Sequence, residues 1–242
     1  MKKIFAVILA LALALCACAF AEEAPAVMSY ADYIAAELET EVTIEAYVQA
    51  HQSWWEDQIT VYVADEDGAY FLYNMACSEE DAEKLVPGTK IRATGYKTEW
   101  SGEVEIADAS FEFVEAEPWI AEPVDVTELL GSDALAEKMN QKVAFKGMTV
   151  EPSTIEGDET EYAFLYNWDG SGQEGANNDL YFNVSKDGVT YTFTVESYLC
   201  GEGTDVYEAV KALNVGDVID LEGFLYWYNG ANPHITAVAA AE

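Results

Sequence analysis

Two short polar segments in the first half of the chain combine tryptophan with carboxylates. The segments are 51–57 and 99–103, and their candidate binding residues are His51, Trp54, Trp55, Glu99, Trp100 and Glu103. Planar aromatic faces beside carboxylate acceptors suit a sugar ring, a peptide or a cationic ligand. Aromatic side chains also dominate cores and interfaces. The six residues therefore predict either a ligand-binding rim or tryptophans that cover a barrel end or pack against a second domain.

A second group of aromatic and polar residues lies in the second half of the chain. Its members are Trp168, Trp227, Tyr228, Asn232 and His234. Amide and imidazole groups stand here beside the aromatic rings, where the first group has carboxylates. We therefore predict a second candidate site with a different chemistry.

Neither group has the spacing of a catalytic or metal-binding motif. His51 and His234 lie in non-equivalent places, and Ser53 is close to His51 only in sequence, whereas a catalytic triad is defined by its geometry. The acidic segments 65–67 and 169–179 lack the residue order of a calcium-binding loop. The sequence predicts a protein that is not an enzyme and that uses no cofactor and no metal ion.

The elements that would carry these residues occur twice along the chain. The matching segments are 85–91 with 213–219, 95–96 with 223–224, and 100–102 with 228–230, all in the same order. The turns Asp67-Gly68 and Asp187-Gly188 also correspond. The order of these markers predicts a tandem repeat, whose second copy contains an inserted polar loop.

Each copy has the pattern of a small β-barrel. Val42, Ile44, Ala46 and Val48 alternate with polar residues, as in a strand with one buried face. Two further strands flank the 65–68 turn, a helix follows over 78–85, and two strands meet near 100–102. Three strands, a helix and two strands is the order of the OB-fold, a five-stranded Greek-key barrel. A β-sandwich is the alternative.

The repeat and the helix position together resemble the tandem OB-type domains of exported and lipoprotein-like bacterial proteins. The expected fold class is mainly β, with two consecutive OB-like five-stranded barrels. Each barrel should have a leading helix and a short helix between strands three and four. Gly95 and Gly223 should lie at bulges or bends. The expected domains are 22–116, a linker over 117–126, and 127–242 with the inserted loop near 148–178.

The first 21 residues have the layout of a secretory signal peptide. Lys2 and Lys3 precede an apolar run, and Ala19-Phe20-Ala21 is a suitable cleavage site. Two alternatives remain open: an uncleaved membrane anchor, because residues 4–21 are long enough to approach a membrane span, and lipidation at Cys18. The expected location is outside the cytoplasm, either secreted or tethered to the outer face of the cell membrane.

The formal net charge of the chain is −34. Nucleic-acid binding draws much of its affinity from lysine and arginine, so this composition predicts no nucleic-acid partner. It also disfavours adsorption to anionic lipid and favours a soluble monomer. The remaining partners are an extracellular ligand or another protein.

Cys77 and Cys200 are the cysteines outside the predicted signal segment, and both precede the helix of their copy. Equivalent residues can meet on a pseudo-twofold axis, which would allow an interdomain disulfide. The alternative is that each cysteine is a small buried residue of its own barrel.

These observations lead to two functional hypotheses. The first is an exported, non-enzymatic binding module that recognises carbohydrate or peptide through its aromatic loop rims. The second is a structural or interaction protein of the cell envelope, whose aromatic residues serve domain packing and whose partner is another protein.

Overall fold

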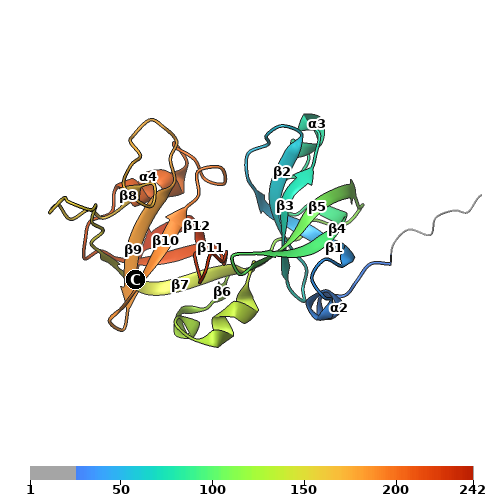
Figure 1. Ribbon diagram of the computed structural model, residues 1–242, viewed down its shortest axis with the longest axis horizontal. Helices are drawn as coiled ribbons and strands as arrows, with labels where there is room; N and C mark the ends of the chain where they lie inside the picture. Colours follow the sequence, from blue (N-terminus) through green and yellow to red (C-terminus); the bar gives the residue numbers. More distant parts are fainter. Residues whose placement is uncertain (1–25, 242) are drawn as a thin grey trace, which may run out of the picture.

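The chain forms two β-barrels that lie side by side (Figure 1). The computed structural model describes residues 26–241; the predicted signal segment and the lipidation candidate Cys18 lie outside the described residues. The strands of the first barrel are β1 (Glu41–His51), β2 (Gln58–Ala64), β3 (Ala69–Ala76), β4 (Lys90–Trp100) and β5 (Glu103–Phe113). The strands of the second barrel are β7 (Lys142–Glu151), β9 (Leu180–Lys186), β10 (Val189–Val195), β11 (Val218–Phe224) and β12 (His234–Ala240).

Both barrels have the same strand topology. The first has the order β1-β2-β3-β5-β4 and closes through pairing of β1 with β4. The second has the equivalent order β7-β9-β10-β12-β11 and closes through β7 and β11. In each barrel the third and fifth strands are parallel and the other pairs are antiparallel. The predicted fold class, mainly β with two OB-like barrels, is confirmed.

The remaining elements are short. They are the helices α2 (Tyr30–Ala35), α3 (Glu79–Ala82) and α4 (Asp205–Lys211), the 3-10 helices η1 (Thr127–Leu129) and η2 (Asp133–Lys138), and the two-residue strands β6 (Val124–Asp125) and β8 (Leu165–Tyr166). Helices α3 and α4 lie between the third and fourth strands of their barrels, as the repeat predicted. No helix within residues 26–241 is long and apolar enough to cross a membrane.

Two predicted boundaries differ from the structure. The segment before the second barrel forms two 3-10 helices in place of one continuous helix, because Gly131 adopts a positive φ of 76° between them. The predicted loop at 99–103 is a two-residue turn at Ser101 and Gly102, both with positive φ, as tight hairpins require. Glu99, Trp100 and Glu103 are therefore strand residues.

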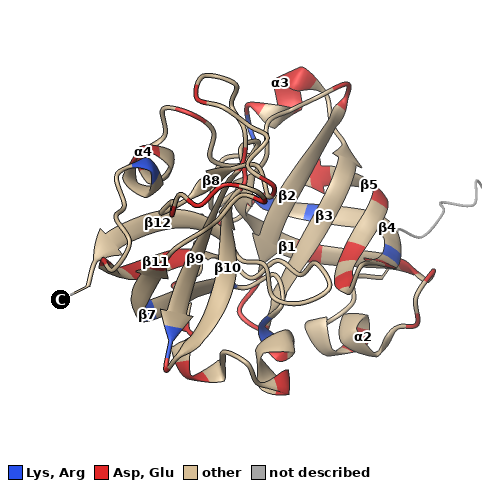
Figure 2. Ribbon diagram, turned by 60° about the vertical axis from the view of Figure 1, so that its left-hand side comes forward, with Lys and Arg blue, Asp and Glu red and all other residues tan. Residues whose placement is uncertain are grey.

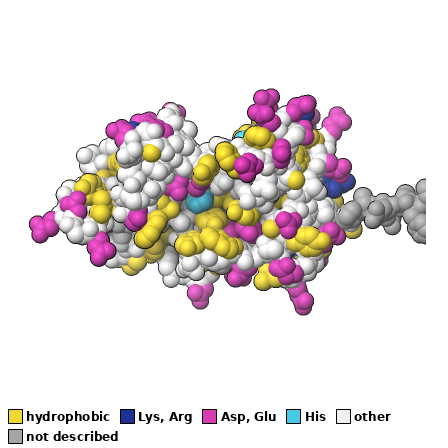
Figure 3. All heavy atoms as spheres, turned by 45° about the horizontal axis from the view of Figure 1, so that its top comes forward, with side chains coloured by type: hydrophobic (Ala, Val, Ile, Leu, Met, Phe, Trp, Pro, Cys, Tyr) yellow, Lys and Arg dark blue, Asp and Glu magenta, His cyan; other side chains and the backbone are white. Residues whose placement is uncertain are grey.

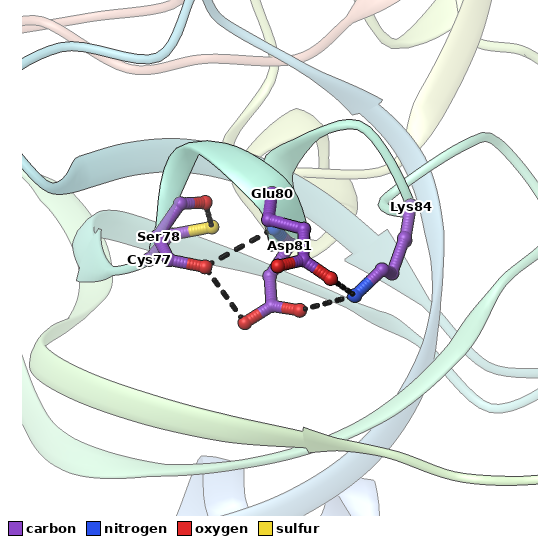
Figure 4. A network of polar contacts seen from close by, with 5 residues as sticks. All are labelled: Cys77, Ser78, Glu80, Asp81 and Lys84. Atoms are coloured by element: carbon purple, nitrogen blue, oxygen red, sulfur yellow. Dashed lines mark hydrogen bonds and ion pairs between the residues drawn. The ribbon is translucent and has the colours of Figure 1, made fainter.

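Helix α3 shows why a four-residue helix forms at this place. Ser78 accepts a hydrogen bond from the backbone N–H of Asp81 at 3.1 Å, and its hydroxyl donates to the Asp81 carboxylate at 2.9 Å (Figure 4). Lys84 bridges the carboxylates of Glu80 and Asp81. The side-chain cap satisfies a donor that the first helical turn leaves free. Ser78 is therefore the N-cap of α3.

The two glycines predicted at bulges lie there. The register between β4 and β5 shifts at Gly95, and the register between β11 and β12 shifts at Gly223. A Cβ atom on Gly223 would lie 2.2 Å from the backbone oxygen of His234, so only glycine fits. This close approach places the start of β12 directly against β11.

The apolar residues of each barrel form a separate core. Val42, Ile44, Ala46 and Val48 point into the first core, which confirms the predicted alternation. Phe145, Phe182 and Phe193 lie in the second core. Acidic residues are distributed over both barrels, whereas basic residues are few (Figure 2).

The structure does not contain the interdomain disulfide that the repeat allowed. Cys77 and Cys200 are both free thiols. Cys77 packs in the core of the first barrel and Cys200 packs against the core of the second. Each cysteine is therefore a small apolar residue of its own barrel.

Candidate functional site

The barrels meet through a small aromatic core that belongs to neither one alone. Tyr62 of β2 and Phe71 of β3 lie on the outer face of the first barrel and pack with Phe224 of β11. The rings of Tyr62 and Phe224 are stacked, with centroids 4.3 Å apart and planes 11° apart. Since neighbouring residues on β2 and β3 fill the first barrel, these strands are apolar on both faces, as strands covered on both sides are.

A buried hydrogen bond lies next to this aromatic core. The hydroxyl of Tyr62 is 3.0 Å from Nδ1 of His234, the first residue of β12. Burial lowers the pKa of His234 to about 3 and raises the pKa of Tyr62 well above its ordinary value. Both groups are therefore uncharged at neutral pH, and the bond adds no buried charge to the interface.

Two backbone–backbone hydrogen bonds and one bond from a backbone N–H to a side chain continue the interface. The N–H of Asn229 donates to the Ser101 oxygen at 2.7 Å, and the N–H of Ser53 donates to the Tyr198 oxygen at 2.7 Å. The N–H of Trp227 donates to Glu103 Oε2 at 2.8 Å.

Glu103 is an acid buried at this interface. Burial raises its pKa to about 8, although hydrogen bonding from the Asn140 side chain and from the Trp227 N–H favours the ionised form. Within the described residues, Glu103 Oε1 and Asn140 Oδ1 have no hydrogen-bond donor.

A cavity of about 620 Å³ opens beside the interdomain core. We call it the interbarrel cavity. Its lining residues are Gln52, Phe71, Tyr73, Trp100, Trp168, Asp179, Tyr181, Thr194, Glu196, Tyr226, Tyr228, Asn232 and His234. Figure 3 shows hydrophobic side chains gathered over the junction between the two lobes, with a histidine among them. The cavity volume lies in the range of small-molecule sites.

Aromatic rings from both barrels form the walls of the interbarrel cavity. Phe71 packs edge-to-face on Tyr226, with centroids 5.5 Å apart. Tyr226 in turn stacks on His234 at 4.4 Å. At the mouth, the rings of Trp100 and Tyr228 lie 5.2 Å apart, and both are about half exposed. Large aromatic groups left open to solvent inside one concavity are typical of a binding surface.

Polar groups on one side of the cavity are held in place by local hydrogen bonds. The carboxylate of Glu196 accepts from the backbone N–H groups of Tyr198 at 3.0 Å and Leu199 at 2.8 Å. The Thr194 hydroxyl donates to Asn232 Oδ1 at 2.8 Å, which fixes the orientation of that amide. Burial raises the pKa of Glu196 to about 7. These groups are positioned before any ligand enters.

The structure combines parts of the two predicted sites. Trp100 of the first group lines the same cavity as four members of the second group, which are Trp168, Tyr228, Asn232 and His234. These five residues come from both barrels. The structure thus brings residues of both predicted groups to one cavity.

The other predicted residues lie outside the cavity. The indole of Trp54 donates to the Cys77 oxygen at 2.8 Å and packs on the first core, Trp55 is exposed, and Trp227 packs over Gly102. His51 contacts the backbone oxygen of Gln52. Glu99 is exposed and Glu103 is buried. Trp54 and Trp55 thus do not share a rim with Trp100 in the interbarrel cavity.

Several lining residues are not among the predicted site residues, including Phe71, Tyr73, Tyr181, Tyr226 and Glu196. A signal was present for the first two. In the alternation of β3, Tyr70 and Leu72 point into the barrel, so Phe71 and Tyr73 are apolar residues on an outer face. An outer face with aromatic residues indicates a covering element or a ligand. Glu196 had no such signal.

A second hollow lies along β7, β11 and β12 of the second barrel and has a volume of about 650 Å³. Alanines and charged side chains line it, and its lining contains no aromatic residue. Within the described residues, no group of three or more histidine, cysteine, aspartate or glutamate side chains is placed to hold a metal ion. The interbarrel cavity is the better candidate site.

Comparison with known proteins gives likeness only at the level of solved structures. No protein-family model matches the chain, and no curated protein matches it. A murine DNA-binding protein bound to double-stranded DNA is 13% identical over 83% of this chain and 96% of that chain, with a TM-score of 0.37. The Ifi202 HINa domain with 20-bp double-stranded DNA is 12% identical, covers 85% of this chain and 97% of that chain, and has a TM-score of 0.35. The tetrameric p202 HIN2 domain is 12% identical over 85% and 96%, with a TM-score of 0.33.

These structures contradict the partner predicted from composition. Two of the three contain double-stranded DNA. The sequence, in contrast, predicts no nucleic-acid partner and a secreted module for carbohydrate or peptide. Net charge sums the whole surface, whereas a binding face is a local feature. We therefore withdraw the exclusion of nucleic acid and the predicted carbohydrate or peptide ligand. At these TM-scores the likeness supplies no argument for what this chain binds, and so the ligand must be argued from the cavity.

The acid at the interface gives a first testable prediction. The Glu103 carboxyl group ionises near pH 4.5 when exposed and near pH 8 in the folded protein, so the folded state holds its proton more tightly. Stability must then fall as pH rises through this window. The wild type should therefore lose about 2 kcal/mol of unfolding free energy between pH 6 and pH 8. Glu103→Gln has no carboxyl group at this position and should not show that loss.

Urea unfolding at pH 6, 7 and 8 measures this difference, with Glu99→Gln as the control that removes an exposed carboxylate from the same hairpin. If the gap between wild type and Glu103→Gln stays constant over this range while Glu99→Gln behaves as the wild type, Glu103 is ionised in the folded protein at pH 6.

Proposed function

We propose that this protein binds a small organic molecule with a planar or ring-shaped apolar group in the interbarrel cavity. The observation that carries the proposal is the wall of seven aromatic side chains, which both barrels supply around a space of about 620 Å³. Sites for small molecules are concave, largely apolar and equipped with a few fixed polar groups. The proposal concerns binding and assigns no catalytic step to the cavity.

The exposure of two lining rings supports a ligand over simple domain packing. The interdomain core of Tyr62, Phe71 and Phe224 already excludes water from the contact between barrels. Trp168 is 76% exposed and Tyr228 is 50% exposed, so these rings contribute little to that contact. A bound ring could cover them and gain the free energy of removing apolar surface from water.

The walls also come from elements that hold their positions. Tyr73 lies on β3, Trp100 ends β4, Tyr181 lies on β9 and His234 begins β12. Strand positions fix side chains better than loops do, which lowers the entropy cost of ligand binding. Trp168 comes from the inserted loop, and Tyr226 and Tyr228 come from the segment between β11 and β12.

A pair of tryptophan variants tests this proposal. Trp168→Ala should weaken binding of small aromatic compounds about five- to ten-fold, because a ring at the cavity mouth is lost. Trp55→Ala should leave binding unchanged, since Trp55 is similarly exposed at 68% but does not line the cavity. Both residues are exposed, so neither variant should lose much stability.

Ligand-observed NMR with indole, 2-phenylethanol, 2-phenylethylamine and phenylacetate provides the measurement, and a 12-bp DNA duplex is included as a further probe. Equal weakening by Trp168→Ala and Trp55→Ala would contradict the assigned cavity. Binding of the duplex alone, with none of the aromatic compounds bound, would replace the proposal with nucleic-acid binding.

We further propose that the protein acts outside the cytoplasm. Support comes from the signal-like layout of residues 1–21, which lie outside the described residues. Mass spectrometry of the protein from its native host separates the possibilities. A mass beginning at Glu22 supports export with cleavage, a lipid-modified Cys18 supports tethering, and an intact amino terminus on cytoplasmic protein would contradict the proposal.

A further inference from the structure

The charged groups in the interbarrel cavity are of one sign. Asp179 and Glu196 line it, and neither lysine nor arginine is among its lining residues. His234 does not balance them, because burial keeps it uncharged. The lining therefore combines a net negative charge with seven aromatic faces.

From this combination we propose that the ligand of the interbarrel cavity is an organic cation, an ammonium group attached to an apolar or aromatic body, and that Glu196 is its counter-ion. The inference rests on the proposed function and names the chemical class of its ligand. A cation is attracted to the faces of tryptophan and tyrosine, and this attraction grows when water is excluded.

The geometry of Glu196 suits this role. Its residue is buried, and the backbone N–H groups of Tyr198 and Leu199 hold the carboxylate from one side. Gln52 of the first barrel faces the same carboxylate. The carboxylate thus lies at the cavity wall between the two barrels, supported from behind and fixed in orientation.

Asp179 differs from Glu196 in its bonding. Its Oδ1 accepts from both the backbone N–H and the hydroxyl of Ser197, at 2.8 and 2.7 Å. Asp179 thus uses one oxygen, whereas both oxygens of Glu196 accept backbone N–H groups. Glu196 is the more buried of the two carboxylates, so we assign it the contact with the cation and Asp179 a supporting charge.

A neutral ligand would leave the cavity carboxylate unpaired and out of water, whereas a cation would pair with it. Covering a carboxylate with an apolar group takes it out of water without a compensating charge, which is unfavourable. An ammonium group in the same place pairs with the carboxylate. The two carboxylates of the lining disfavour a small anionic ligand in the same place.

The state of Glu196 makes binding depend on pH. Its pKa is raised to about 7 by burial, with a smaller contribution from the charge of Asp179. The other titratable groups around it are Tyr62, Tyr181, Cys200 and His234, which stay uncharged between pH 5.5 and pH 8 because burial shifts each pKa away from that range. Glu103, with a pKa of about 8, is close to Tyr226 but does not line the cavity.

Three compounds with the same phenyl ring separate charge from shape: 2-phenylethylamine is cationic, 2-phenylethanol is neutral and phenylacetate is anionic. At pH 8 and low salt the amine should bind about ten-fold more tightly than the alcohol, and phenylacetate should not bind. Calorimetry or NMR titration of the full chain gives the three affinities.

Removing the counter-ion should remove the preference. In Glu196→Gln the ratio between amine and alcohol should fall to about three-fold or less. Glu115→Gln, which removes an exposed carboxylate outside the cavity lining, should keep the wild-type ratio. In the wild type and in Glu103→Gln the ratio should also fall between pH 8 and pH 5.5, so the pH series decides the matter even if Glu196→Gln fails to fold.

The outcomes distinguish this inference from the function on which it rests. Equal affinity for amine and alcohol, with both weakened by Trp168→Ala, would overturn the cation and leave the cavity as the site. A preference for the amine that persists unchanged in Glu196→Gln and at pH 5.5 would overturn the role of Glu196. If none of the three compounds nor indole binds, both the inference and the proposed function are wrong.

Discussion

The arrangement of the two barrels depends on the buried contact between Tyr62 and His234. The hydroxyl and Nδ1 are 3.0 Å apart, and both residues are buried. Breaking the bond would leave a buried polar group without a partner, at a cost of about 1–3 kcal/mol. The stacking of Tyr62 on Phe224 adds a directional aromatic contact at the same point. Because His234 also lines the interbarrel cavity, the contact that sets the barrel arrangement also sets the shape of the site.

Acids at the interface impose a second constraint. Glu103 and Glu196 are buried on either side of the contact, and burial raises both pKa values toward neutrality. In a chain with net charge −34, further burial of ionised carboxylates would work against association of the barrels. Glu103 meets this constraint by holding a proton. Glu196 lies at the cavity, where a cation can meet it instead.

The sequence determined the barrels well because their signals are local. Alternation in β1, the cap at Ser78 and the glycines at 95 and 223 each follow from a few neighbouring residues. The site could be predicted only in part, because it forms where outer faces of separate barrels meet. Trp100 and Trp168 were recognised as aromatic residues in polar segments, but nothing in the sequence places them on one cavity. Trp54 has the same local context as Trp55, but its indole N–H donates to the Cys77 backbone oxygen of its own barrel.

The most direct test of the cavity uses the indole N–H signals of the six tryptophans in a titration with 2-phenylethylamine. Trp100 and Trp168 line the cavity, whereas Trp54, Trp55 and Trp119 do not. We expect saturable shifts of the Trp100 and Trp168 signals, with one shared dissociation constant. The signals of Trp54, Trp55 and Trp119 should not change. Shifts centred on Trp54 and Trp55 would contradict this account, because they would place the ligand on the first barrel alone.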